Sequence, residues 1–132
     1  MARILVIEDD DLLRTVLANA LAAAGHDVME ATNGQEGLDR FRAAPTDLVL
    51  TDIVMPVQEG VETILQLRRN HPTLPIIAMS GGVANSKLYL TIAGRMGASR
   101  VIAKPFTPQY LLSVVNEVLA DPSAPRPHEP DS

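Results

Sequence analysis

The sequence contains no cysteine, and only 3% of its residues are aromatic. The lack of cysteine excludes disulfides and thiolate ligands, so a bound metal would have to be held by oxygen or imidazole groups. Because 46% of the residues are hydrophobic but few carry rings, Leu, Val, Ile and Ala must fill the core. These absences predict an aliphatic core, and they favour a hard cation if the protein binds a metal ion.

Clustered positive charge and long apolar stretches are also missing. The formal net charge is −5, whereas nucleic-acid surfaces need clusters of Lys and Arg to hold the phosphate backbone. No apolar run approaches the ~20 residues of a membrane span. The apolar run that follows Arg3 is too short for a signal peptide. We therefore expect a cytoplasmic protein that binds neither nucleic acid nor membrane.

Short apolar runs alternate with stretches of helical periodicity along most of the chain. This alternation predicts an α/β fold with a parallel sheet, helices on both of its faces and right-handed crossovers. The expected strands are 4–7, 27–31, 48–51, 76–79 and 100–103, and the expected helices are 11–24, 35–43, 61–69, 86–96 and 108–119.

The chain length of 132 residues suits one folded domain. After Asp121 the sequence holds four prolines and no apolar pattern, which is typical of disorder. We therefore expect one domain over residues 1–121 and a disordered, proline-rich tail over residues 122–132.

Polar side chains follow the predicted strands at the points where these strands end. They are Glu8 and Asp9, Asp52, Ser80 and Lys104. Taken singly, each is as well explained as a helix cap, a turn residue or a solvated charge. Ligands of open parallel sheets bind at the carboxyl ends of the strands, however, so their shared location indicates one site.

The chemistry of these groups points to phosphoryl transfer. Three neighbouring carboxylates repel one another unless a cation binds them, and oxygen ligands favour Mg²⁺. A carboxylate such as Asp52 can attack a phosphoryl group when a metal, the Lys104 ammonium and the Ser80 hydroxyl stabilise the phosphoryl oxygens. The histidines lie outside this pattern and are expected to be ordinary surface residues.

Four motifs together resemble the receiver domains of response regulators, over residues 3 to about 120. They are Ile-Leu-Val-Ile-Glu-Asp-Asp at 4–10, Asp52 with Met-Pro-Val-Gln-Glu-Gly at 55–60, Met-Ser-Gly at 79–81, and Lys-Pro-Phe at 104–106. The resemblance implies a flavodoxin-like three-layer sandwich with strand order 2-1-3-4-5 and five helices. It also implies a cis peptide bond between Lys104 and Pro105.

The resemblance further implies a role for each site residue. Asp52 would be the phosphoacceptor, Ser80 would contact the phosphoryl group and Lys104 would pair with it. Mg²⁺ would be bound by Asp9, Asp52 and the Val54 carbonyl, with Glu8 acting through water. A histidine kinase or histidine phosphotransfer protein would supply the phosphoryl group.

The same resemblance implies a signalling domain rather than a conventional enzyme. With no further domain after residue 121, we expect a stand-alone receiver that switches its binding to a downstream protein, which the sequence does not identify. One position departs from the family. Receivers commonly carry Tyr or Phe three residues before the Lys, and here Val101 occupies that position, so the usual aromatic switch is absent.

Two alternatives remain open from the residues. A phosphohydrolase of the haloacid-dehalogenase kind also uses an Asp nucleophile, but it would need an Asp-x-Asp motif after the first strand and a cap domain. A receiver-like module that only docks partners would be expected to lose acidic or Lys positions, and here all are present.

Overall fold

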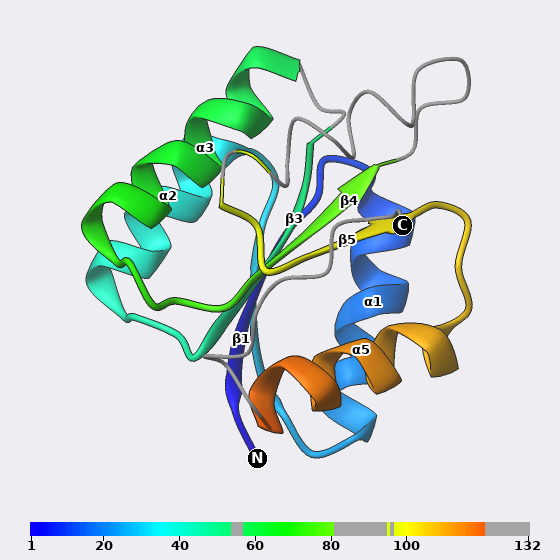
Figure 1. Ribbon diagram of the computed structural model, residues 1–132. Helices are drawn as coiled ribbons and strands as arrows, with labels where there is room; N and C mark the ends of the chain where they lie inside the picture. Colours follow the sequence, from blue (N-terminus) through cyan, green and yellow to red (C-terminus); the bar gives the residue numbers. More distant parts are fainter. Residues whose placement is uncertain (54–56, 81–94, 96, 121–132) are drawn as a thin grey trace.

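The computed structural model describes residues 1–53, 57–80, 95 and 97–120 (Figure 1). No helix in this part of the chain has the length and apolar character needed to span a membrane. The described strands are β1 (Arg3–Ile7), β2 (Asp27–Ala31), β3 (Leu48–Asp52), β4 (Ile76–Ser80) and β5 (Arg100–Ala103), and the described helices are α1 (Asp11–Ala23), α2 (Gly34–Ala43), α3 (Val57–Asn70) and α5 (Pro108–Ala120).

All five strands are parallel and lie in the order β2-β1-β3-β4-β5, which confirms the expected flavodoxin-like topology. β3 lies at the centre, and every one of its residues is buried. The parallel register makes the carboxyl ends of neighbouring strands meet, with Asp52 opposite Met79 and Ser80 opposite Ala103. The expected helix over 86–96, apart from Arg95, and the tail over 122–132 lie outside the described residues.

Successive strand residues face opposite sides of the sheet, so the core has two parts. Leu5 and Ile7 pack with side chains of α2 and α3, whereas Ile4 and Val6 pack with side chains of α1 and α5. Figure 1 shows the same arrangement, with α2 and α3 on one face of the sheet and α1 and α5 on the other. The three-layer sandwich is therefore confirmed, and among the described residues Phe41 is the one aromatic side chain in an otherwise aliphatic buried core.

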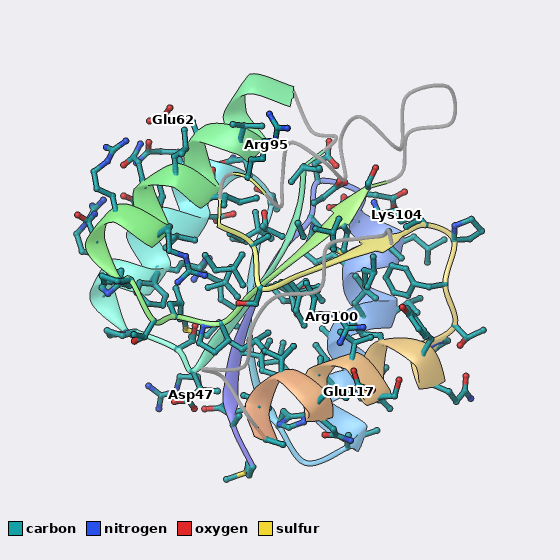
Figure 2. All side chains as sticks on the ribbon, viewed as in Figure 1. Asp47, Glu62, Arg95, Arg100, Lys104 and Glu117 are labelled. Carbon is teal, nitrogen blue, oxygen red and sulfur yellow. The ribbon has the colours of Figure 1, made fainter. Side chains whose placement is uncertain are left out.

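Local polar contacts fix where the helices begin. Asp10 is the N-cap of α1, because its carboxylate accepts a hydrogen bond from the Leu13 amide at 3.1 Å. Asn33 caps α2 in the same way through the Glu36 amide at 2.8 Å, so this helix begins at Gly34, one residue before the expected start. A further polar contact holds a helix against the sheet. An ion pair of 2.6 Å joins Arg100 on the edge strand β5 to Glu117 on α5 (Figure 2).

One helix boundary was predicted wrongly. The apolar periodicity placed the start of α3 at Val61, but the helix begins at Val57. Gly60 explains why the periodicity missed the first turn of α3 and why this turn can pack closely against Ile53. Glycine is a poor helix former, yet a Cβ at this position would lie 2.8 Å from the Ile53 Cα, so only glycine allows this approach.

Candidate functional site

The structure brings the residues singled out in the sequence to one edge of the sheet. Glu8 and Asp9 follow β1, and Lys104 follows β5. Asp52 and Ser80 are the last residues of β3 and β4, rather than the first residues after them. Since β1, β3, β4 and β5 are consecutive neighbours in the sheet, these ends form one continuous rim.

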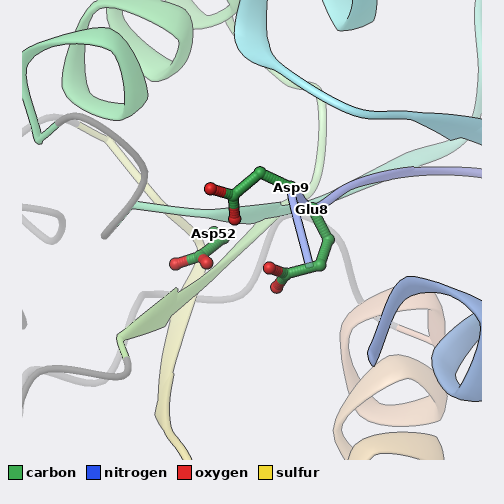
Figure 3. Close-up of side chains that lie close together, drawn as sticks. All are labelled: Glu8, Asp9 and Asp52. Carbon is green, nitrogen blue, oxygen red and sulfur yellow. The ribbon is translucent and has the colours of Figure 1, made fainter. Parts of the chain in front are cut away.

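Three carboxylates converge at this rim. One oxygen from each of Glu8, Asp9 and Asp52 lies within 4.8 Å of the others. Figure 3 shows the three side chains directed toward a common space, with Glu8 and Asp9 coming from one turn of the chain and Asp52 from β3. Glu8 is fully buried and Asp52 is only 3% exposed, whereas Asp9 is exposed. Buried negative charges at this spacing repel one another strongly unless cations offset them.

Lys104 supplies part of that compensation. Its Nζ donates hydrogen bonds of 2.9 Å to Glu8 Oε1 and 2.9 Å to Asp52 Oδ2. Its amide donates to the Ser80 carbonyl at 2.8 Å, which continues the pairing of β4 with β5 up to the site. The peptide bond between Lys104 and Pro105 is cis, as expected.

Burial and hydrogen bonding act in opposite directions on these ionisable groups. Burial raises the pKa of Glu8 to about 7, although hydrogen bonds from Lys104 and the Asp10 amide partly oppose this rise. Burial alone would lower the pKa of Lys104, but its hydrogen bonds to Glu8 and Asp52 outweigh burial and raise that pKa above its usual value. Lys104 therefore stays an ammonium, and the carboxylate cluster remains short of positive charge.

The side chain of Ser80 is buried at the end of β4. It is fully inaccessible, and its Oγ has no hydrogen-bond partner within the described residues. Buried hydroxyls are nearly always paired, because leaving one unpaired costs about 1–3 kcal/mol. At the end of β4, beside Asp52 and Lys104, this hydroxyl is suited to a ligand that accepts a hydrogen bond.

The donor set fits Mg²⁺. This ion prefers six oxygen ligands at about 2.0–2.1 Å, so its ligand oxygens lie about 3–4 Å from one another. The three carboxylate oxygens all lie within 4.8 Å of one another, which is near enough for one ion to draw them together. When all three acids are ionised, as metal binding would favour, they leave two negative charges uncompensated beside one ammonium, and a divalent cation would neutralise these charges. Val54, whose carbonyl was expected as a further ligand, lies outside the described residues.

One residue that contacts the site was not singled out by sequence reasoning. Arg14 lies on α1, and its Nη1 donates a hydrogen bond of 2.8 Å to the Glu8 carbonyl. The available signal was an arginine beside the apolar stripe of the helix, close after the acidic turn. The side chains of His26 and His71, in contrast, contact the Ala2 amide and the Phe41 ring, and among the described residues neither side chain has a recorded contact with the site.

Comparisons with known proteins agree with this geometry. The family model of the response regulator receiver domain matches residues 4–116. The chemotaxis protein CheY of Thermotoga maritima is 31% identical over 117 residues, which cover 88% of this chain and 96% of that protein. A solved CheY-like receiver domain protein of Methanospirillum hungatei superposes with a TM-score of 0.82 at 27% identity, covering 92% of this chain and 96% of that one.

Longer relatives match over only part of their length. The DNA-binding transcriptional regulator NtrC of Rhizobium meliloti is 35% identical over 121 residues, which are 92% of this chain but 25% of that protein. The chain thus spans about a quarter of the length of the NtrC regulators that it matches. The family model matches most of the chain, the strands have the expected order, and three carboxylates and Lys104 converge at the rim: the chain belongs to the response regulator receiver domain family of two-component systems.

Proposed function

We propose that Asp52 accepts a phosphoryl group from the phosphohistidine of a kinase or phosphotransfer protein, in a reaction that requires Mg²⁺. The observation that carries the proposal is the environment of Asp52. Its carboxylate is 3% exposed, lies among two further carboxylates, and is bonded to the Lys104 ammonium at 2.9 Å. Membership of the receiver family supports this reaction over the phosphohydrolase alternative.

In the proposed reaction, an Asp52 carboxylate oxygen bonds to phosphorus as the phosphorus–nitrogen bond of phosphohistidine breaks. The leaving imidazole keeps the electron pair of that bond and takes up a proton. Lys104, already at Asp52 Oδ2, stabilises the charge on a phosphoryl oxygen, and the Ser80 hydroxyl, which has no partner among the described residues, donates a hydrogen bond to another. Mg²⁺, when bound, neutralises the carboxylates and polarises the phosphoryl group.

Different site residues would hold the metal in different ways. We infer that Asp9, Asp52 and the Val54 carbonyl bind it directly, and that Glu8 acts through water. The hydrogen bonds of Glu8 support the indirect role, since its two carboxylate oxygens already accept from Lys104 Nζ and from the Asp10 amide. Asp9 has no hydrogen bond or ion pair within the described residues, which leaves its carboxylate available.

The product of this reaction is a modified protein, so its role would be signalling rather than turnover of a small molecule. We propose that phosphorylation changes how the domain binds a downstream protein. The NtrC relatives carry the words DNA-binding in their names, but the chain matches only a quarter of their length. With a formal net charge of −5, we do not extend nucleic-acid binding to this chain.

The proposal is tested by incubating the protein with acetyl phosphate and Mg²⁺ and measuring its intact mass. We expect the natural protein to gain one phosphoryl group, and to gain none once Mg²⁺ is chelated. Asp52→Asn should not react, whereas Asp39→Asn, which alters an exposed acid on α2 that pairs with Arg42, should react normally. Absence of an adduct on the natural protein would contradict the proposal and favour a module that only docks partners.

A further inference from the structure

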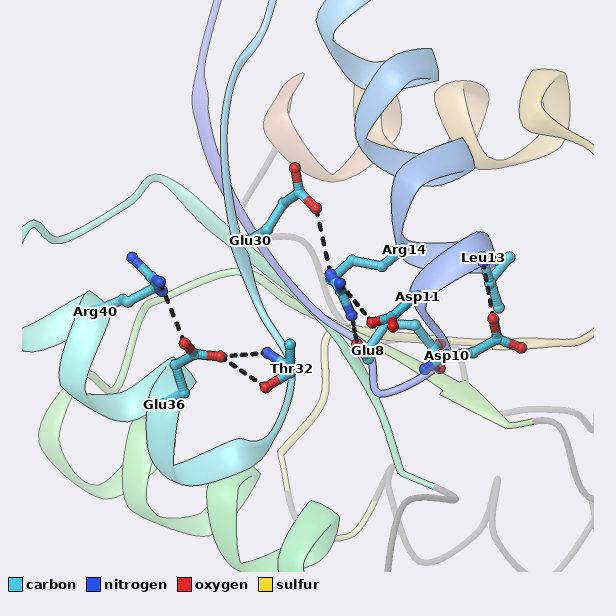
Figure 4. A network of polar contacts seen from close by, with 9 residues as sticks. All are labelled: Glu8, Asp10, Asp11, Leu13, Arg14, Glu30, Thr32, Glu36 and Arg40. Atoms are coloured by element: carbon cyan, nitrogen blue, oxygen red, sulfur yellow. Dashed lines mark hydrogen bonds and ion pairs between the residues drawn. The ribbon is translucent and has the colours of Figure 1, made fainter.

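Glu8 is fully buried, and each of its polar atoms takes part in a hydrogen bond. Its amide donates to the Ala31 carbonyl at 3.0 Å, and its carboxylate oxygens accept from Lys104 Nζ at 2.9 Å and from the Asp10 amide at 3.1 Å. Its carbonyl accepts from Arg14 Nη1 at 2.8 Å (Figure 4). The Arg14 bond is the only one of the four that comes from a side chain outside the proposed phosphoryl-transfer site.

The guanidinium of Arg14 is itself held by acceptors from three segments. Besides the Glu8 carbonyl, Nη2 lies 2.7 Å from Asp11 Oδ1 on α1, and Nε lies 3.3 Å from Glu30 Oε1 on β2. Figure 4 shows Arg14 reaching from α1 across to β2 between these partners. The side chain is 13% exposed, so little of it is free to move into solvent. A planar fork presents N–H donors on three separate nitrogens and so reaches all three acceptors, whereas the donors of a lysine all radiate from one nitrogen.

The carbonyl that Arg14 holds belongs to the peptide bond between Glu8 and Asp9. Rotation of this peptide would redirect both side chains that we place at the metal, one acting through water and one directly. Groups that orient metal ligands commonly contribute to affinity without touching the metal, because the ligands are then ordered before binding.

We propose that Arg14 is a positioning residue of the metal site, which fixes the Glu8–Asp9 peptide so that both carboxylates face Asp52. The inference rests on the proposed function, since it concerns the same Mg²⁺ site. Arg14 acts through a backbone carbonyl and not on the phosphoryl group. Its loss should therefore weaken Mg²⁺ binding more than it alters the chemistry of the loaded site.

The test is a Mg²⁺ titration of the full chain, followed through the amide NMR shifts of residues 8–10 and 52. Arg14→Met should raise the Mg²⁺ Kd by roughly tenfold or more. The matched control is Arg100→Met, which removes another strand-to-helix ion pair, with Glu117, away from the carboxylates. This control should leave the Kd unchanged. Urea unfolding measures the stability of both variants. If both lose stability to the same extent, a difference between their Mg²⁺ Kd values does not come from destabilisation.

A second readout separates positioning from general damage. With acetyl phosphate, Arg14→Met should need more Mg²⁺ for half-maximal phosphorylation, but its rate at saturating Mg²⁺ should approach that of the natural protein. A purely structural role would lower the rate at every Mg²⁺ concentration and would overturn the inference. Glu30→Gln, which keeps Arg14 but weakens one of its three contacts, should raise the Kd by less than Arg14→Met does.

The outcomes distinguish this inference from the proposed function. If the natural protein binds Mg²⁺ and Arg14→Met has the same Kd, the role of Arg14 is wrong and the proposed function stands. If the natural protein shows no Mg²⁺-dependent shifts, the proposed function itself is contradicted. Should Arg14→Met fail to fold, Arg14→Lys decides: it keeps one charge but has all its donors on one nitrogen, so a raised Kd supports the inference and an unchanged Kd overturns it.

Discussion

Lys104 Nζ lies 2.9 Å from Asp52 Oδ2, although the two residues are 52 positions apart in the chain. The same nitrogen lies 2.9 Å from Glu8 Oε1, so one ammonium serves two buried carboxylates. This contact joins the end of β3 to the residue after β5 and makes the proposed phosphoacceptor part of a charge network.

Replacing Lys104 with Met should impair both stability and reaction. The buried Glu8 and Asp52 carboxylates lose their cation, and we expect the free energy of unfolding without Mg²⁺ to fall by about 1–2 kcal/mol, less than for a fully buried pair because Lys104 is 19% exposed. Phosphorylation by acetyl phosphate should slow by a factor on the order of 100, since a group that stabilises phosphoryl charge is lost. Urea unfolding and intact mass measure the two effects, and an unchanged reaction rate would contradict the role of Lys104.

Ser80 and Ser99 should respond oppositely to replacement by Ala. Ser80 Oγ is buried and unpaired within the described residues, so Ser80→Ala should leave the free energy of unfolding unchanged or raise it by up to about 1 kcal/mol. Ser99 Oγ accepts from the Ile76 amide at 3.2 Å, so Ser99→Ala should lower it by about 1 kcal/mol. Phosphorylation should be slower only in Ser80→Ala. A clear loss of stability in Ser80→Ala would show that the Ser80 hydroxyl already has a hydrogen-bond partner in the natural protein.

Asp9→Asn should reverse its effect on stability when Mg²⁺ is added. Without the metal, it removes one of three repelling carboxylates and should raise the free energy of unfolding by about 0.5–1 kcal/mol, a small gain because Asp9 is exposed. At a Mg²⁺ concentration about 100 times the Kd, the natural protein gains about 2.7 kcal/mol and should become the more stable of the two. Asp39→Asn should show no such reversal in the same urea titrations, and a reversal there would point to a nonspecific ion effect.

Much of the fold and of the site could be predicted from the sequence, because both depend on short-range patterns. Continuous apolar runs indicated buried parallel strands, and this parallel arrangement predicted that Glu8, Asp52 and Lys104 lie at one rim. The order of the strands came from the resemblance to receiver domains. The start of α3 was missed because Gly60 interrupts the helical pattern, and its reason, the close approach to Ile53, is tertiary.

Contacts between distant side chains could not be predicted in this way. The role of Arg14 depends on how α1 lies over β2, which brings Glu30 within reach of the guanidinium. The double contact of Lys104 with Glu8 and Asp52 likewise depends on side-chain positions across three strands. Periodicity gives the face on which a residue lies, but not its partner.

Phosphorylation should be transmitted mainly through the segment after β4. Val101 is partly buried and packs against the core on the α2 and α3 side, and a β-branched side chain has few rotamers with which to switch. The sequence offers Gly81 and Gly82 instead, which lie outside the described residues and can change conformation at low steric cost. With fluoroberyllate and Mg²⁺, amide shift changes should concentrate at residues 80–87 and be smaller at Val101 and α5. Equally large changes in β5 and α5 would mean that another side chain carries the switch.

The central claim is that Asp52, and not another acid of the cluster, receives the phosphoryl group. The most direct measurement is to treat the protein phosphorylated by acetyl phosphate with borohydride, which reduces an aspartyl phosphate to homoserine, and to locate the changed residue by peptide mass spectrometry. We predict homoserine at position 52 alone, with Glu8 and Asp9 unchanged. Modification at Asp9, or at an acid outside the rim, would contradict the account.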